Sequence, residues 1–307
     1  MRLQNLHLLS EYNVPARLQL LVLDFLTNRQ QYVRTEYELS STVTINTGAP
    51  QGCVLSAFLF IVYTNALSQC SPNCKILKYA DDTVVIGLIS NDNEDEYRQT
   101  ISYVSEWCSN NYLNLNVSKT KEMILDMRKN KNVKTPVTIN DSPVDIVPSY
   151  KYLGVTIQDN LKWNEHIEIQ TKKANKRMYN VRRLQKLRID SKILCLFYNS
   201  VISSVLVYAI SSWYNACDNK LKKTICKFHN KVCKIVNAPA HRFIEHPSDV
   251  CQKKCISLIN KIVHDQNHIL HRYITLLPHG NLQTVKCRTE RFRQTFLPVA
   301  IKLYNTK

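Results

Sequence analysis

Apolar residues follow two different spacings in the first part of the chain, and each spacing predicts a different kind of element. Residues 15–28 place leucine, valine and phenylalanine three and four positions apart, which predicts an amphipathic helix. Residues 31–45 are rich in β-branched and aromatic residues and predict two short strands. A break that contains glycine and proline, at residues 48–52, precedes a second helix whose apolar face runs from Leu55 to Ala66.

Two apolar segments flank Asp81 and Asp82 within residues 75–87, and this arrangement predicts a β-hairpin with the acidic pair at or beside its tip. Acidic residues at 91–96 open a further helix, because they complement the unpaired backbone N–H groups of its first turn. Strands are predicted around residues 121–127, 136–140, 144–147 and 150–157, with Asn140, Asp141 and Ser142 in a turn.

The second half of the chain has a helical period almost throughout. From Trp163 onward, apolar residues recur every three or four positions, and lysine and arginine occupy many of the positions between them. This change of period places a domain boundary near residues 158–162. The pattern therefore predicts an α+β fold, with a mixed domain over residues 1–158 and a helical domain over residues 159–307.

Charge separates the same two halves. The 307 residues carry a formal net charge of +17, yet residues 1–150 hold 13 Lys and Arg against 15 Asp and Glu, a net charge of −2. Residues 151–307 hold 28 against 9 and carry +19. An excess of positive charge that is confined to one half of the chain indicates a surface that binds a polyanion. A content of 44% apolar residues excludes a wholly disordered or collagen-like chain.

The first residues of the chain lack the uninterrupted apolar stretch of a signal peptide. We therefore expect an intracellular protein that is not secreted and that works in the nucleus or the cytoplasm, where polyanions are available. The eleven cysteines are expected to be reduced thiols in that compartment rather than disulfides.

Asp81 and Asp82 are the first candidates for chemistry. Adjacent carboxylates raise each other's pKa unless a cation is close, and a divalent metal ion removes that conflict. Mg²⁺ is commonly held by one or two carboxylates together with substrate phosphates, and a pair of such ions supports phosphoryl transfer. An isolated pair of aspartates is more often a solvated turn, so the surrounding residues have to decide between the two interpretations.

The surrounding residues resemble the sequence boxes of reverse transcriptases. Four segments match these boxes in family order: residues 47–56, 79–82, 118–121 and 150–155. The second of them, Tyr79-Ala80-Asp81-Asp82, is similar to the catalytic box. Residues 163–167 and 291–301 look typical of the polymerases of non-LTR retrotransposons, which makes that subtype the best match.

The resemblance implies a partial palm, which is a small antiparallel sheet backed by helices, followed by a mostly helical thumb and C-terminal region. It also implies RNA-directed DNA synthesis, in which a DNA primer is extended on an RNA template by deoxynucleoside triphosphates (dNTPs). The cofactor would be Mg²⁺ in a two-metal site. Asp81 would be the principal metal ligand, and Asp82 would tune the site or assist at the primer end.

Further roles follow from the same resemblance. Nucleotide and template contacts would fall to Gly48, Pro50, Gln51, Gly52 and Tyr79. Lys119 would protonate or neutralise the leaving pyrophosphate, with Lys121 as the alternative. The primer would be gripped by a hairpin of Tyr152, Leu153 and Gly154. Each assignment has an ordinary structural alternative: a loop before a helix, a half-buried strand tyrosine, a solvated lysine and a tight turn.

Residues 163–188 place eight Lys and Arg on one long amphipathic element. The resemblance makes this element a thumb helix that follows the phosphates of the template–primer duplex. The candidate backbone contacts are Lys172, Lys173, Lys176, Arg177, Arg182 and Arg183. A helix face that is charged only for solubility is the alternative.

The family also needs an aspartate on an upstream strand. Asp24 is superficially similar, but it lies in a helix-periodic segment only 24 positions before Gly48. We therefore expect a chain that begins inside the palm, without the fingers and the first catalytic aspartate box. Its Mg²⁺ site would be incomplete and the chain inactive, or nearly so, by itself. A non-catalytic, nucleic-acid-binding remnant of such a polymerase is the alternative.

Two other patterns raise the alternatives of a membrane-spanning helix and a zinc site, and other residues argue against both. Residues 193–217 carry no charge, but the polar side chains among them argue against a membrane-spanning helix. Cys251, Cys255, His264 and His268 form two pairs at helical spacing. The short gap between the pairs argues for core cysteines rather than a zinc site.

Overall fold

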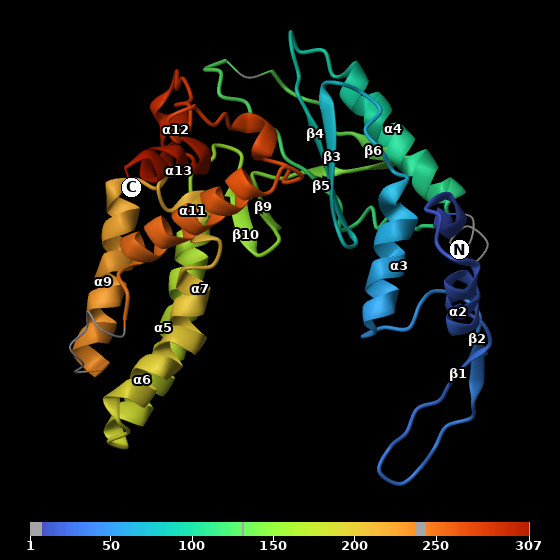
Figure 1. The fold of residues 1–307 in the computed structure, drawn as a ribbon, viewed down its shortest axis with the longest axis horizontal. Coiled ribbons are helices and arrows are strands. Elements are labelled where there is room, and N and C mark those ends of the chain that lie inside the picture. Colours follow the sequence, from blue (N-terminus) through green and yellow to red (C-terminus); the bar gives the residue numbers. More distant parts are fainter. Residues whose placement is uncertain (1–7, 131, 237–243, 307) are drawn as a thin grey trace. The chain divides into compact units, whose positions relative to one another are not determined.

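The structure, a computed structural model, describes residues 8–130, 132–236 and 244–306. Contacts divide the chain into two compact units, which Figure 1 shows together. The first unit contains Met1–Glu122 and Val133–Ile146, and the second contains Met123–Asn132 and Val147–Lys307. The domain boundary predicted near residues 158–162 stays a prediction.

The first unit combines helices with short two-stranded sheets, which confirms the predicted α+β class. Its helices include α2 (Ala16–Leu26), α3 (Val54–Asn65) and α4 (Asp95–Asn110). Its strands are β1 (Arg29–Gln31), β2 (Val43–Ile45), β3 (Cys74–Tyr79), β4 (Asp82–Gly87), β5 (Lys121–Glu122), β6 (Thr138–Ile139), β7 (Ser142–Pro143) and β8 (Asp145–Ile146). The pairs β1–β2, β3–β4 and β6–β7 are antiparallel, and β5 pairs with β8 in parallel.

The strand predicted over residues 121–127 is wrong after residue 122. Its partner, β8, ends at Ile146, and Pro148 follows two residues later. Because proline has no backbone N–H, the parallel ladder cannot continue past this point. The predicted turn at Asn140 and Asp141 is confirmed, with both residues at positive φ between β6 and β7.

Three small apolar clusters, rather than one continuous core, hold the first unit together. One joins α2 to α3 through Val22, Leu26 and Leu59. A second lies between α4 and the β3–β4 hairpin around Val104 and Cys108. The third packs the β6–β7 hairpin against α4 through Val137, Ile139, Val144, Tyr97 and Ile101.

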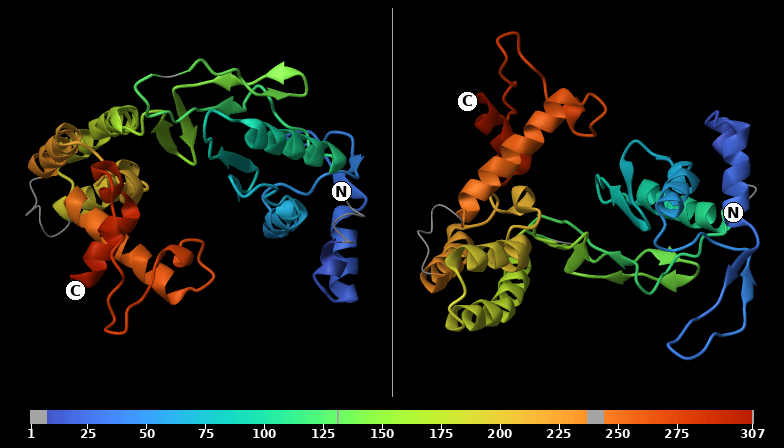
Figure 2. Two further views of the ribbon diagram at one scale, coloured as in Figure 1. Left: turned by 90° about the horizontal axis from the view of Figure 1, so that it is seen from above. Right: turned by 60° about the horizontal axis from the view of Figure 1, so that its bottom comes forward.

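The second unit begins with an antiparallel hairpin of β9 (Ser149–Tyr152) and β10 (Val155–Gln158). Helices follow: α5 (Asn164–Lys186), α6 (Ser191–Tyr198), the π-helical turn η1 (Asn199–Ser203), α7 (Ser204–Leu206), α8 (Ile210–Trp213), α9 (Asn219–Val236), α11 (Pro247–His264), the 3₁₀ turn η2 (His271–Tyr273), α12 (Glu290–Arg293) and α13 (Phe296–Asn305). Helices α5 and α9 pack against each other (Figures 1 and 2).

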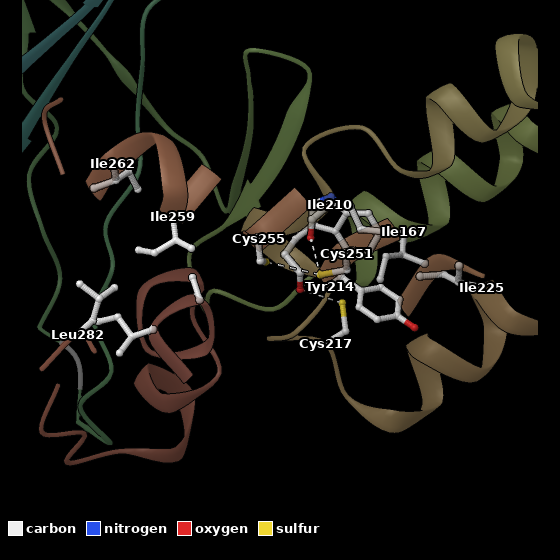
Figure 3. Close-up of a cluster of buried hydrophobic side chains, with 13 residues drawn as sticks. Ile167, Ile210, Tyr214, Cys217, Ile225, Cys251, Cys255, Ile259, Ile262 and Leu282 are labelled. Carbon is white, nitrogen blue, oxygen red and sulfur yellow. Dashed lines mark hydrogen bonds between the residues drawn. The ribbon is translucent and has the colours of Figure 1, made fainter. Parts of the chain in front are cut away.

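Two apolar clusters form the core of the second unit. In the larger one, α8, α11 and α13 meet around Trp213, Ile259 and Ile301. Figure 3 labels Ile210 of α8 and Ile259 of α11 in this cluster. In the other, Met178 of α5 and Val232 of α9 pack with residues of α6 and η1. These clusters leave the outer faces of α5 and α9 to charged side chains.

Residues 193–217 form several short elements instead of one uninterrupted helix. Helix α6 ends at Tyr198, a π-helical turn follows, and Ala209 has a left-handed φ of +49° before α8. Among the described residues, no helix has both the length and the apolar character needed to cross a bilayer.

Candidate functional site

The acidic pair lies at the tip of the β3–β4 hairpin, as predicted. The strands pair from Cys74 opposite Gly87 to Tyr79 opposite Asp82, so a turn of Ala80 and Asp81 closes the hairpin. Ala80 has a left-handed φ of +51°. Asp81 and Asp82 are both exposed, which leaves their carboxylate oxygens open to a cation.

Lys78 fastens this hairpin to helix α3. Its Nζ donates to the carbonyl oxygens of Thr64 and Leu67, at 2.7 Å each, and to that of Asn65 at 3.3 Å. Carbonyls at the end of a helix lack partners within it and carry the negative end of its dipole, so they are suited to an ammonium group. Burial lowers the pKa of Lys78. The residue directly before the acidic box is thus held in place.

The opposite root of the hairpin is packed on α4. Gly87 ends β4, and a Cβ at this position would lie 2.7 Å from Cδ2 of Tyr97. The Tyr97 hydroxyl hydrogen-bonds Glu122, and burial raises the pKa of Tyr97. Glu122 also accepts the backbone N–H of Val137 at 3.2 Å. Glycine is required at the root because an aromatic ring occupies the space of a side chain.

The loop of residues 48–52 stands at the other end of α3. Gly48 and Gly52 have φ values of +65° and +80°, so backbone conformation favours glycine at both positions. A Cβ on either would meet no atom within 4 Å. Arg29 ties the loop to β1 by donating to the Gly48 carbonyl at 2.9 Å. Gln51 is exposed and Pro50 is half-buried.

Helix α3 connects the loop to the hairpin without bringing them into contact. Its 12 residues span about 18 Å at 1.5 Å per residue, with the loop before its first turn and Lys78 at its last. Between residues 48–52 and the aspartates, the described side chains form no hydrogen bond or ion pair. The two sets of predicted residues are therefore positioned by one rigid element but lie apart.

Tyr79, Lys119 and Lys121 differ in how far their side chains are open to a ligand. Tyr79 is 64% exposed, so the alternative of a half-buried strand tyrosine is wrong. Lys119 is exposed, and its side chain forms no ion pair with any described residue. Lys121, by contrast, pairs with Asp145 at 2.6 Å, across the β5–β8 ladder. Of the two lysines, Lys119 is the one free to meet a ligand.

The predicted grip residues form the turn of the β9–β10 hairpin. Leu153 and Gly154 have φ values of +45° and +83°, and Tyr152 pairs with Val155 at the end of the ladder. The hydroxyl of Tyr208 donates to the Leu153 carbonyl at 2.9 Å. A Cβ at Gly154 would lie 3.0 Å from Cε1 of the same ring. This tip is therefore pinned by a residue 55 positions away in the sequence.

A second set of contacts joins the β9–β10 hairpin to helices α5 and α8. The backbone N–H of Thr156 donates to Nδ1 of His166 at 3.3 Å, and the His166 ring meets Trp213 edge-on with centroids 5.3 Å apart. Trp213 in turn donates from Nε1 to the Tyr208 carbonyl at 2.9 Å. Burial, together with the charge of Lys173, lowers the pKa of His166 to about 4. His166 is therefore neutral at physiological pH.

Most of the basic side chains on α5 that are candidates for phosphate contacts are exposed to solvent. Lys172, Lys173, Lys176, Arg182 and Arg183 are exposed. Arg177 is half-buried and donates from Nη1 to the carbonyl of Val201 in the π-helical turn, so it has a structural contact. Lys172 pairs with Glu168 at 2.6 Å, and the guanidinium of Arg183 lies over the ring of Tyr179.

Residues 5–157 match the family model of the reverse transcriptase, or RNA-dependent DNA polymerase. The chain belongs to the reverse transcriptase family. The matched segment contains the loop of residues 48–52, the acidic β3–β4 hairpin and the pinned turn at Leu153 and Gly154. Residues 163–204, over α5 and α6, match a second family model, the N-terminal part of the alkylated DNA repair protein alkB homolog 8.

Relatives from Drosophila melanogaster agree with this assignment. The probable RNA-directed DNA polymerase from transposon X-element is 25% identical over 241 residues, 75% of this chain and 26% of that protein. The corresponding protein from transposon BS is 26% identical over 62% of this chain and 22% of its own length. The RNA-directed DNA polymerase from mobile element jockey is 26% identical over 68% and 24%.

These relatives confirm a reverse transcriptase of the kind found in non-LTR retrotransposons. The chain spans about a quarter of the length of the curated relatives it matches.

Lys78, His166 and Tyr208 are positions of this chain that sequence reasoning missed. Each makes its decisive contact with a backbone group of another element. One signal was present in the sequence: Lys78 is a basic residue that follows the apolar pair Ile76 and Leu77 and stands directly before the acidic box.

The two cysteine and histidine pairs are not assembled into one site. Cys251 and Cys255 are buried in the core, with their Sγ atoms 4.0 Å apart (Figure 3). His264 bonds the carbonyl of Asn260, and His268 accepts the N–H of Leu270. In residues 8–130, 132–236 and 244–306, no group of three or more His, Cys, Asp or Glu is arranged to hold a metal ion. This finding also covers the surroundings of Asp81 and Asp82.

Proposed function

We propose that this chain takes part in RNA-directed DNA synthesis for a transposable element, and that Asp81 and Asp82 are its metal-binding carboxylates. One observation carries the proposal: the acidic pair is exposed at the tip of a hairpin that Lys78, next to the tip, fastens to α3. Exposure leaves the oxygens open to ligands, while the Lys78 contacts limit their movement. Such positioned carboxylates are what phosphoryl transfer between nucleotides requires.

The donor set at the hairpin tip fits a hard divalent cation. Reverse transcriptases use divalent metal ions, and two adjacent carboxylates supply the oxygen ligands that Mg²⁺ prefers. We assign Asp81 as the principal ligand and Asp82 as its assistant. When bound, Mg²⁺ supplies positive charge that stabilises the charge developing on the transferred phosphoryl group. Lys119, exposed and not ion-paired among the described residues, is assigned to the leaving pyrophosphate.

The remaining residues define the proposed substrates, which are an RNA template, a DNA primer and dNTPs. Gln51 offers both a donor and an acceptor from an exposed turn, and exposed Tyr79 offers a ring face to the primer end. The pinned β9–β10 turn is assigned to the primer grip. The exposed lysines and arginines of α5 are assigned to backbone phosphates.

We also propose that the isolated chain makes little DNA. Among the described residues no third carboxylate joins Asp81 and Asp82, and two carboxylates alone hold Mg²⁺ loosely. A non-catalytic role in binding nucleic acid is the alternative, and the positive charge of residues 151–307 favours it. Since all eleven cysteines are free thiols, the chain suits the reducing interior of a cell, in the nucleus or the cytoplasm.

Primer extension separates these possibilities. The purified chain is given an RNA template, a labelled DNA primer, dNTPs and Mg²⁺, and is compared with Asp81→Asn and with Asp141→Asn. Asp141 is an ideal control because it is an exposed aspartate in another hairpin turn of the same unit. We expect weak synthesis that Asp81→Asn abolishes and Asp141→Asn leaves unchanged. Synthesis that survives Asp81→Asn would contradict the proposed site, and robust Asp81-dependent synthesis would contradict only the proposed weakness.

A further inference from the structure

A cysteine and a histidine that lie outside all the polymerase boxes meet beside α9. The Sγ atom of Cys226, on α9, lies 3.4 Å from Nε2 of His246, the residue that precedes α11. Both side chains are half-buried. A thiol in contact with an imidazole, which is in turn oriented by a third group, is the arrangement that activates a cysteine as a nucleophile. The contacts of His246 show whether that third group is present.

Ser248 orients the other ring nitrogen of His246. Its Oγ lies 2.7 Å from Nδ1 of His246 and donates to Oδ1 of Asp249 at 3.0 Å. Because the Ser248 hydroxyl proton is directed to Asp249, the oxygen accepts from Nδ1–H, and Nε2 is then the acceptor that faces Cys226. The backbone N–H of Ser248, which would favour the other tautomer, approaches Nδ1 at the longer distance of 3.3 Å. A chain of contacts therefore runs from the Cys226 sulfur to the Asp249 carboxylate.

The surroundings of Cys226 suit the negative charge that develops on its sulfur during an attack. The hydroxyl of Tyr214 hydrogen-bonds Cys226. The sequence contains no Asp or Glu from residue 219 to residue 244, while Lys223 and Lys227 stand close to Cys226 on the same helix. Reactive cysteines are found in such electropositive, partly exposed surroundings.

A second cysteine and histidine pair on α9 provides a comparison within the same region. Sγ of Cys233 lies 3.5 Å from Nε2 of His229, and the rings of His229 and His246 meet edge-on with centroids 5.2 Å apart. His229 is buried, however, and burial raises the pKa of Cys233. The two pairs therefore share the contact between sulfur and imidazole and differ in the burial of the imidazole.

We propose that Cys226 is a modification site whose thiol attacks peroxides, with His246 as its base. The thiol proton passes to Nε2 of His246 while the sulfur attacks one peroxide oxygen. An S–O bond forms and the O–O bond breaks, and the leaving hydroxide takes the proton from Nε2 and departs as water. The sulfur is oxidised by two electrons to a sulfenic acid, and the peroxide is reduced by two. Asp81 and Asp82 take no part in this reaction.

The other cysteines provide the reference rates. Cys70 is exposed, and its Sγ donates to Oγ1 of Thr100 at 3.4 Å. A hydroxyl is not a base at neutral pH, so Cys70 represents an accessible thiol without activation. Burial closes six further thiols to a peroxide in solution, namely Cys74, Cys108, Cys195, Cys217, Cys251 and Cys255.

The test measures oxidation at each cysteine of the full, reduced chain. Limiting hydrogen peroxide is added at neutral pH, the sulfenic acid is trapped with dimedone, and mass spectrometry of the digested chain gives the rates at Cys226, Cys70 and Cys233. A positioned base accelerates such a step by about 100-fold or more, and half-burial slows the entry of peroxide. We therefore expect Cys226 to react at least about tenfold faster than Cys70, and Cys233 to be the slowest. A Cys226 rate no higher than that of Cys70 would overturn the proposal.

His246→Asn is the main variant, because asparagine still caps the first turn of α11 but is not a base. The rate at Cys226 should fall to about that of Cys70. The matched control is His264→Asn, which removes an exposed imidazole at the other end of α11 and should leave the Cys226 rate unchanged. Oxidation of Cys226 that is equally fast in the His246→Asn protein would overturn the proposal.

A second variant covers the case in which His246→Asn unfolds the second unit, which thermal unfolding reveals. Ser248→Ala keeps the base and removes the hydroxyl that orients it, so the Cys226 rate should fall by about threefold. If His246→Asn is unfolded, an unchanged Cys226 rate in Ser248→Ala overturns the proposal. In denaturant, Cys226 and Cys70 of the unchanged chain should react at equal rates. A Cys226 advantage that persists there would also overturn the proposal, since local sequence and not the folded contact would cause it.

Discussion

The two hairpins that resemble polymerase boxes are held in opposite ways. The β3–β4 hairpin is fixed along its strands, by Lys78 on α3 and by Gly87 against Tyr97 of α4, and its acidic tip is left open. The β9–β10 hairpin is fixed at its tip, where Tyr208 covers the turn of Leu153 and Gly154. The difference fits their proposed roles, because a metal-binding tip has to admit ligands and a supporting turn has to resist movement.

The largest expected effect is a loss of stability at acidic pH, caused by His166 beside the β9–β10 hairpin. The pKa of His166 is about 4 in the folded protein against 6.5 unperturbed, so the unfolded chain takes up a proton first as pH falls. The free energy of unfolding therefore has its full value above pH 6.5, where His166 is neutral in both states. It decreases as the pH falls from 6.5 toward 4, by about 3 kcal/mol for a pKa shift of this size. Denaturant unfolding at a series of pH values, followed by tryptophan fluorescence, measures this loss of stability.

His166→Asn is the matched variant for this prediction. Its side-chain oxygen keeps an acceptor near Thr156 but does not titrate. The extra acid sensitivity should therefore disappear in the variant. Equal acid sensitivity in both proteins would show that other groups cause it.

The next effect concerns the root of the acidic hairpin. Gly87→Ala should destabilise the first unit by about 2 kcal/mol, because the new methyl group meets the Tyr97 ring and the hydrogen bond to Glu122 keeps that ring in place. Hydrogen exchange of β3 and β4 amides reports the local change.

A double-mutant cycle supplies the control. In a Tyr97→Ala background, the additional cost of Gly87→Ala should fall to that of an ordinary strand substitution. A cost that persists without the ring would show that backbone conformation, and not packing, selects glycine at this position.

These contacts also show how far sequence reasoning reaches in this chain. The acidic hairpin, the loop of Gly48 and Gly52, and helices α3 and α5 followed from local periodicity and turn residues. Lys78, His166 and Tyr208 did not, because each meets a backbone group 10 to 55 positions away. The π-helical turn after Tyr198 was equally hidden, since an uncharged run has no local mark for an inserted residue.

A smaller effect is expected for the brace on α3. Lys78→Met retains most of the side-chain volume but leaves the last carbonyls of α3 without their donor, at a cost of about 1.5 kcal/mol. Faster hydrogen exchange should appear near Tyr79 and Asp82 and not in the second unit. Unchanged exchange at the hairpin tip would remove Lys78 as its anchor.

The smallest expected loss of stability concerns the β9–β10 turn that Tyr208 holds in place. Tyr208→Phe keeps the ring over Gly154 and removes only the hydrogen bond to Leu153, so a loss of about 1 kcal/mol is expected. Tyr208→Ala should cost more, because it also removes the packing. Equal effects of the two substitutions would show that the hydroxyl alone pins the turn.

Metal binding at the open tip is the most direct test of the account. Mn²⁺ serves as a paramagnetic probe, and its binding to the full chain is measured with the RNA–DNA hybrid and a dNTP present. We predict that Asp81→Asn weakens Mn²⁺ binding at least about tenfold, while Asp141→Asn, in the exposed turn between β6 and β7, has no effect. Equal Mn²⁺ affinity in the Asp81→Asn and Asp141→Asn proteins would contradict it.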